Sequence, residues 1–363
     1  MRTAPEGDRE SRRRLVGQGL VLLAVLATLL VGISPTPYAV ERPGPVYDTL
    51  GTTLRDRQEV PVIAIDGATT YPTDGRLDLL TVYLDGSREN PLDWFQVIGA
   101  WFDPTRAILP LDAVFPMGET EDEADEQSAV DMQQSQQSAV AAALSQLEIS
   151  YDSTVGVGLV SPDGPSNGVL QEGDELLTVG GVAVTTESEL RAAIADAGVG
   201  SALELGIRRD GTPQTVTVTT AARSASDDRP VIGIAPTESY QFPFQVDINL
   251  QDVGGPSAGM MFALGIYDLL TPGALTGGAH IAGTGTIDAA GEVGRIGGIR
   301  QKMFGARDAG AEWFLAPAGN CDEVVGHIPD GLQVFSVATL DDAIAVTRAI
   351  GTGASTEGFA RCR

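Results

Sequence analysis

The chain of 363 residues contains 23 basic residues, and Lys302 is the only lysine among them. Lysine and arginine differ chemically, because a guanidinium stays charged in proteins whereas an ammonium can lose its proton and act as a base. A position that keeps lysine in an arginine-rich chain is therefore a candidate for proton transfer. The surrounding stretch GGIRQKMFGARDAG predicts a helix on which Ile299, Lys302, Met303 and Ala306 share one face.

A lysine on the buried face of this helix would lose hydration, and desolvation lowers the pKa of an ammonium. At the ordinary pKa of about 10.4, only about one amine in 2,500 is neutral at pH 7, and a pKa of about 7 requires about 4 to 5 kcal/mol from the environment. The alternative is a lysine whose stem packs while its head stays in water. Arg300 and Gln301 are expected to point away from the buried face.

A serine supplies the second chemical candidate. In the stretch DVGGPSAGMMFALGIYDLL, Ser257 stands at the start of a predicted apolar helix that runs to about Leu270. The backbone N–H groups and the positive dipole end of such a helix would stabilise an oxyanion formed on a carbonyl attacked there. The alternative is that Ser257 merely caps the helix. Together, Ser257 and Lys302 suggest a Ser-Lys dyad in which the neutral amine accepts the hydroxyl proton.

The elements that must position this pair belong to the last third of the chain. After a polar linker at 224–230, strand-like and helix-like stretches alternate, which predicts an α/β domain at 231–351 followed by a tail at 352–363. Before the linker, 150–223 contains LQEGDELLTVGG, a helix opened by the capping box of TTESEL, and two strands joined at RRDGTP.

The region 34–149 is predicted to be rich in strands. Short alternating stretches lie between Val60 and Val114, separated by Gly, Pro and Asp turns. An acidic solvated loop is expected at 118–127 and a helix at 128–147. We expect the region to form a unit of its own, which either regulates access to the protease or spaces it from the membrane.

The N-terminus predicts a membrane anchor. Three arginines, Arg12 to Arg14, precede an apolar stretch in which Leu15 to Ile33 would form a helix about 28 Å long, close to the thickness of a bilayer's hydrocarbon core. The arginines place 1–14 in the cytoplasm, 15–33 in the cell membrane and the remainder outside the cytoplasm. The alternative is a cleaved signal peptide. The stretch is longer than an ordinary signal core, and no Ala-x-Ala site follows it.

Composition excludes several classes of partner. With 49 acidic residues and a net charge of −26, the chain is not expected to bind nucleic acid. Two histidines and two cysteines show no ligand spacing, so no metal is expected. Cys321 and Cys362 fit an oxidising compartment, either as a disulfide or as two free thiols. A Walker A motif needs Gly-Lys-Ser/Thr, which the single lysine does not provide, so neither ATP nor another cofactor is expected.

The order GGPSAG, AGTGTIDAAGEVGRIGGIRQK and AGAEWFLAP resembles the proteolytic domain of the Lon family of serine peptidases over about 241–350. The resemblance implies that Ser257 is the nucleophile, that Lys302 is the general base and that Thr284 can hydrogen-bond the lysine. It also implies backbone oxyanion donors near the serine, and Gly255, Pro256 and Ala258 are the expected supporting or oxyanion residues there. One departure is Gly254, which stands where many members have an acidic residue. The nearby Asp252 is not assigned that role.

The segment 150–223 resembles a PDZ domain of the bacterial protease-associated kind, a class that adds a peptide as an extra strand at a sheet edge. No clear carboxylate-binding loop precedes Val155, where SYDST stands. As a whole, the multidomain α+β chain resembles the membrane-anchored, PDZ-containing Lon-like proteins of bacteria. The resemblance implies polypeptide substrates and a homo-oligomer, a hexamer in the family. Because no ATPase is present, we expect unfolded or flexible substrates.

Two rival functions remain open from the sequence. GPSAG also fits the Gly-x-Ser-x-Gly elbow of α/β-hydrolases, with Asp322 and His327 as the other members of a triad. Against this, too few residues precede Ser257 to supply the strands of that fold. The other rival is a non-catalytic scaffold, in which the PDZ-like part binds peptide ends and the Lon-like part is structural.

Overall fold

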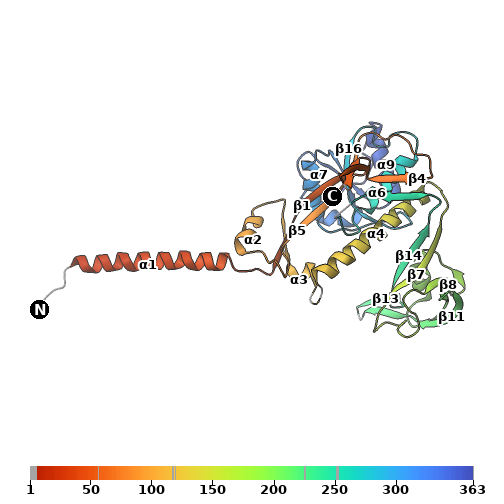
Figure 1. Ribbon diagram of the computed structural model, residues 1–363, viewed down its shortest axis with the longest axis horizontal. Helices are drawn as coiled ribbons and strands as arrows, with labels where there is room; N and C mark the ends of the chain where they lie inside the picture. The colour runs from red at the N-terminus through yellow and green to blue at the C-terminus, as the bar shows by residue number, and fades with distance from the viewer. Residues whose placement is uncertain are drawn as a thin grey trace.

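A long N-terminal helix, a mixed α/β body and a smaller β-rich body make up the chain (Figure 1). The computed structural model describes residues 6–55, 57–116, 118, 120–224, 226–250 and 253–362. The helices are α1 (Glu6–Gly32), α2 (Trp94–Trp101), α3 (Leu111–Val114), α4 (Glu121–Gln146), α5 (Glu187–Ala197), α6 (Gly259–Leu270), α7 (Ile299–Asp308), the 3-10 helix η1 (Ala318–Asn320), α8 (Cys321–Val324) and α9 (Leu340–Gly351).

The strands before the β-rich body are β1 (Tyr38–Asp48), β2 (Thr52–Arg55), β3 (Gln58–Pro61), β4 (Ile63–Asp66), β5 (Arg76–Asp85) and β6 (Ala107–Pro110). Those of the β-rich body are β7 (Asp152–Val160), β8 (Glu175–Val179), β9 (Val182–Ala183), β10 (Ala202–Arg209), β11 (Thr212–Thr219), β12 (Ala221–Ser224), β13 (Asp227–Val231) and β14 (Ile234–Gln241). The remaining strands are β15 (Gln245–Ile248), β16 (His280–Gly283), β17 (Thr286–Ile287), β18 (Val293–Gly294), β19 (Trp313–Pro317) and β20 (Gln333–Val337).

The main sheet of the α/β body has the strand order β20-β19-β16-β5-β1-β6. The first four strands are parallel, β1 pairs antiparallel with β5, and β6 pairs antiparallel with β1. Three strands therefore come from 34–149 and three from the C-terminal segment, so the two regions expected as separate units share one sheet. The physical reason lies in β5, whose consecutive residues Leu77 to Leu80 are all buried. A strand buried on both faces needs partners on both sides.

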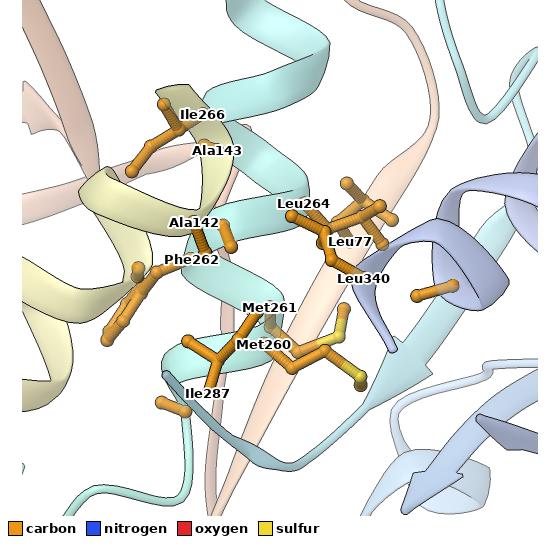
Figure 2. Packing of buried hydrophobic residues seen from close by; sticks show 14 of the residues in the cluster. Leu77, Ala142, Ala143, Met260, Met261, Phe262, Leu264, Ile266, Ile287 and Leu340 are labelled. Atoms are coloured by element: carbon orange, nitrogen blue, oxygen red, sulfur yellow. The ribbon is translucent and has the colours of Figure 1, made fainter. Parts of the chain in front are cut away.

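Helices cover both faces of this sheet. Leu79 packs in the core formed with α4, α6 and α9, whereas the adjacent Leu80 packs with Ile299 and Met303 of α7. Neighbouring strand residues point to opposite faces, so α7 lies across the sheet from α6. Figure 2 shows α6 between α4, β5 and α9, with Met260, Met261 and Phe262 fully buried. The helix that follows Ser257 is thus fixed along its length.

The helix α4 begins earlier than the sequence suggested. Part of the acidic stretch 118–127, expected as a loop, is helical from Glu121 onward. Thr120 and Glu123 form a capping box, in which the Thr120 hydroxyl accepts from the Glu123 N–H and the Glu123 carboxylate accepts from the Thr120 N–H. This local signal starts the helix in spite of the high charge of its first turns.

The β-rich body extends past its expected end at 223. Its sheet has the order β11-β10-β8-β7-β14, with β9 paired to β8 and α5 packed against the sheet core. The edge strand β14 follows the polar linker, and the linker itself supplies β13, which pairs with β12. The body therefore closes only at Gln241, immediately before the chain returns to the α/β body.

The two ends of the chain differ in their packing. In α1, the apolar residues Leu15–Gly32 are long enough to cross a membrane and only 6% of this window is buried, so α1 is not a core helix. The expected C-terminal tail is held by a disulfide between Cys321 and Cys362 and by a hydrogen bond from the Ser336 N–H to the Ala360 carbonyl.

Candidate active site

Ser257 lies in the loop that leads into α6. The N-cap residue of α6 is Ala258, and no side chain caps the helix, so Ser257 is not a capping serine. Its Oγ instead accepts a hydrogen bond from Lys302 Nζ at 2.7 Å. The two residues predicted to form a pair are therefore in direct contact, although they are 45 positions apart.

Lys302 lies on α7, which begins at Ile299 as predicted, and only 2% of the residue is exposed. Burial lowers the pKa of this lysine to about 8, and the negative charge of Glu41 partly opposes that effect. The amine is thus inside the protein and not at the end of a stem that reaches water. Gln301 and Arg300 are expected to point away from the buried face. Gln301 is nevertheless only 3% exposed, whereas Arg300 is exposed.

Thr284 lies between β16 and β17 and contacts both Ser257 and Lys302. Its hydroxyl is fully buried, accepts a hydrogen bond from Lys302 Nζ at 3.0 Å and donates one to the Ser257 carbonyl at 2.9 Å. The Gly285 N–H donates to the same carbonyl at 2.9 Å. These contacts fix both the amine and the backbone of the serine, which is the position that the resemblance implied for Thr284.

The serine loop rests on α4. Ser135 Oγ donates to the Pro256 carbonyl at 2.9 Å, and the Gly255 N–H donates to the Ser128 carbonyl at 2.9 Å. A Cβ atom on Gly254 would lie 2.1 Å from Ser128 Oγ. The close approach of α4 explains why a glycine, and not an acidic side chain, stands three residues before the serine. Asp252 lies outside the described residues.

The candidate oxyanion donors separate into three cases. Pro256 has no N–H and cannot donate to an oxyanion, so of the two expected roles only the supporting one is open to it, through its carbonyl that accepts from Ser135. The N–H of Gly255 is already bonded to Ser128. Within the part of the chain that the structure describes, the N–H groups of Ser257 and Ala258 make no hydrogen bond, and both precede the first turn of α6. These two groups are free to meet a developing negative charge.

Glu41 on β1 is a member of the site that the sequence did not reveal. Its carboxylate lies against the start of α7, since a Cβ atom on Gly298 would be 2.4 Å from Glu41 Oε1. Burial raises the pKa of Glu41, Lys302 opposes this, and Glu323 adds to it. No motif marks Glu41, because only the shared sheet brings β1 next to α7.

The residues of the alternative triad do not assemble. His327 is exposed, and its Nδ1 lies 3.1 Å from the Val325 carbonyl. The Asp322 carboxylate pairs with Arg295 at 3.4 Å. Neither side chain contacts Ser257 within the described residues, so the geometry does not support an α/β-hydrolase site.

Comparison with known families agrees with this geometry. Residues 251–349 match the model of the Lon protease (S16) C-terminal proteolytic domain, and 130–220 match a PDZ domain model. The chain therefore contains a region similar to the C-terminal proteolytic domain of Lon proteases, together with a PDZ domain. The first part of the PDZ match, from residue 130 to the end of α4, packs on α6 in the structure.

Among curated relatives, Lon protease 1 of Sorangium cellulosum is 37% identical over 94 residues, which are 25% of this chain and 11% of that protein. Lon protease of Lachnoclostridium phytofermentans is 33% identical over 93 residues, again 25% of this chain and 11% of the relative. The chain thus spans about a tenth of the length of these relatives. Among solved structures, the PDZ domain of an SdrC-like protein from Listeria monocytogenes is 25% identical in sequence to this chain, with a TM-score of 0.22. The match covers 24% of this chain and 90% of the solved one.

Proposed function

We propose that this protein is a membrane-anchored, extracytoplasmic serine endopeptidase that hydrolyses peptide bonds in unfolded or flexible polypeptides. The observation that carries the proposal is the 2.7 Å contact between Ser257 Oγ and the buried amine of Lys302. With a pKa of about 8, about a tenth of the amines are neutral at pH 7, compared with about one in 2,500 for an ordinary lysine.

In the proposed reaction, the neutral Lys302 amine takes the proton of Ser257 Oγ as this oxygen bonds to the substrate carbonyl carbon. The carbonyl oxygen becomes an oxyanion that faces the N–H groups of Ser257 and Ala258. The Lys302 ammonium then protonates the leaving amine, and the C–N bond breaks to give an acyl-enzyme. Lys302 next deprotonates a water molecule, whose attack on the ester releases the acid and restores the serine.

The PDZ domain is proposed to capture the substrate by strand addition. The segment SYDST, where a binding loop was sought, leads into β7, an interior strand between β8 and β14. The sheet ends in β11 on one side and in β14 on the other, and we propose that the peptide adds at β14. The Ser161 N–H donates to the Gly233 carbonyl at 2.9 Å, so the next residue, Ile234, turns its N–H and carbonyl to the open side. An extended peptide could pair with these groups.

Labelling by a serine-reactive phosphonate, together with cleavage of unfolded casein, tests the peptidase proposal. We expect both in the wild type and neither in Ser257→Ala. Lys302→Arg should retain the fold, measured by circular dichroism, and lose turnover, because arginine cannot accept the proton. The scaffold alternative makes the opposite prediction, that Ser257→Ala changes nothing. Full activity of Lys302→Arg would contradict the role of Lys302 as the base, but it would leave the role of Ser257 as the nucleophile untouched.

The oligomer and cleavage without ATP belong to the same proposal. Because the sequence contains no Walker A motif, we propose that a stably folded protein resists cleavage until it is denatured. The hexamer is taken over from the family and can be tested by the mass of the detergent-solubilised protein.

A further inference from the structure

The short helix α2 carries apolar side chains on two faces. Val97 and Ala100 are buried and pack against Val40 and Leu92 next to β1. The other face consists of large side chains that are mostly in water. Their exposed fractions are 47% for Phe95, 51% for Ile98, 77% for Trp101 and 82% for Phe102, the residue that follows the helix. We call these four residues the α2 apolar face.

This face is unusual within the chain. Among the described residues, no other phenylalanine or tryptophan belongs to the exposed large hydrophobic side chains. The stretch Trp94–Phe102 also carries no charge, although Asp93 and Asp103 flank it. Exposed apolar patches on soluble domains mark sites of interaction, so the face requires a partner with apolar chemistry.

The position of α2 identifies that partner. The N–H and the hydroxyl of Thr36 both donate to the Leu92 carbonyl, at 2.8 and 2.9 Å, and Pro35 forms a bridge with Asp93. The Phe95 ring lies against the end of α1, because a Cβ atom on Gly32 would be 2.1 Å from that ring. Figure 1 shows α2 beside the point where the chain leaves α1. The face therefore lies within a few residues of the proposed membrane boundary.

We propose that the α2 apolar face docks on the lipid bilayer beside the point where α1 emerges, as a second contact between the protein and the membrane. The inference rests on the proposed role of α1 as the anchor. Tryptophan and phenylalanine favour the boundary between acyl chains and headgroups, and a short amphipathic helix can lie in that plane. The flanking aspartates do not attract anionic headgroups, so the contact is apolar and should persist in neutral lipid and at high salt.

The consequence is a fixed orientation of the protease. A single helix followed by a short linker would let the α/β body rotate about the membrane normal and tilt toward either side. Two contacts, α1 and the α2 apolar face, hold the body at one angle, because α2 packs directly on β1 and β6 of the main sheet. The active site would then stay at a defined height above the lipid.

Fluorescence quenching by brominated lipids tests the inference in the full chain, reconstituted in neutral phosphatidylcholine nanodiscs. Trp94→Phe with Trp313→Phe leaves Trp101 as the only tryptophan. Trp94→Phe with Trp101→Phe leaves Trp313 as the only tryptophan. Trp313 lies on β19, and three strands stand between β19 and β6, so the axes of these two strands are about 19 Å apart. A third variant lacks all three native tryptophans and carries Leu26→Trp in α1.

We expect strong lipid quenching for Trp101 and for the Leu26→Trp reporter, and little for Trp313. Quenching of the Leu26→Trp reporter without quenching of Trp101 would overturn the docking and leave the anchor intact. Absence of quenching in both would overturn the anchor as well. Quenching by iodide in the aqueous phase shows why Trp101 would not be quenched by lipid. Trp101 quenched by iodide alone is exposed to water, whereas Trp101 protected from both quenchers is covered by protein, such as a second copy.

Discussion

At the scale of single residues, the Lys302 amine experiences two opposing effects. Burial lowers its pKa to about 8, and the carboxylate of Glu41 raises it. The neutral amine is the active form of the proposed base, so hydrolysis should increase as pH rises through about 8. On the proposed mechanism, Glu41 therefore favours the protonated, inactive form of the amine at neutral pH.

Removing that carboxylate should shift the pH profile. In Glu41→Gln the amine loses its negative neighbour, so its pKa falls and the rising limb of kcat/KM moves to lower pH. The measurement is the rate of cleavage of a fluorogenic peptide from pH 5 to 10. Glu312→Gln, at an exposed position of the same domain, serves as the control and should leave the limb in place. A shift to higher pH in Glu41→Gln would contradict the assignment.

Thr284 has a positioning role that can be separated from folding. Thr284→Val keeps the shape but removes the hydroxyl that bonds both Lys302 and the Ser257 carbonyl. Because small misplacements of a reacting pair reduce rates strongly, we expect kcat to fall about 100-fold with KM little changed. Thr284→Ser restores a hydroxyl and should recover most of the rate. If both variants lost activity equally, the hydroxyl would not be the cause.

At the scale of elements, the loop that precedes β14 positions the edge at which peptide capture is proposed. Gly233 has φ of 75°, and a Cβ atom there would lie 2.7 Å from Pro165 Cδ and 2.8 Å from Gly164 Cα. An alanine would therefore displace the loop and the outward-facing groups of Ile234. Capture by β14 concerns only substrates long enough to reach both domains.

Gly233→Ala should accordingly raise KM for casein by about tenfold, equivalent to about 1.4 kcal/mol, and leave the cleavage of a short peptide unchanged. Gly211→Ala is a matched control, because Gly211 also has a positive φ, of 76°, but lies in open space in the hairpin between β10 and β11. An equal effect in both variants would indicate general destabilisation and not loss of capture.

The elements also show what a sequence can and cannot reveal. The start of α7, the end of α6 and the pairing of Ser257 with Lys302 were predictable, because each depends on a contiguous motif. The α4 contacts of Ser128 and Ser135 and the proximity of Glu41 were not. They depend on the pairing of β5 with β16, and the stretch RLDLLTVYLD indicates a buried strand without specifying its neighbours.

At the scale of the whole molecule, the disulfide between Cys321 and Cys362 closes a loop of 41 residues that contains β20 and α9. In Cys362→Ser the unfolded chain gains conformational freedom, and we expect a loss of about 3 to 4 kcal/mol of unfolding free energy, measured in urea without reductant. A reducing agent should bring the wild type to the stability of the variant. Equal stability of the two proteins under oxidising conditions would contradict this.

The main sheet takes strands from two segments that are far apart in the chain, so it cannot be completed until late in synthesis. His280 on β16 contacts Asp78 on β5 across 202 residues, so β5 lacks its parallel neighbour until most of the chain has been made. At about 5 to 20 residues per second, Lys302 follows β5 by about 10 to 40 s. During that interval the growing chain has no base beside a serine, and on the proposed topology it is crossing the membrane. On the proposed mechanism, hydrolysis can therefore begin only after the last third of the chain has been delivered.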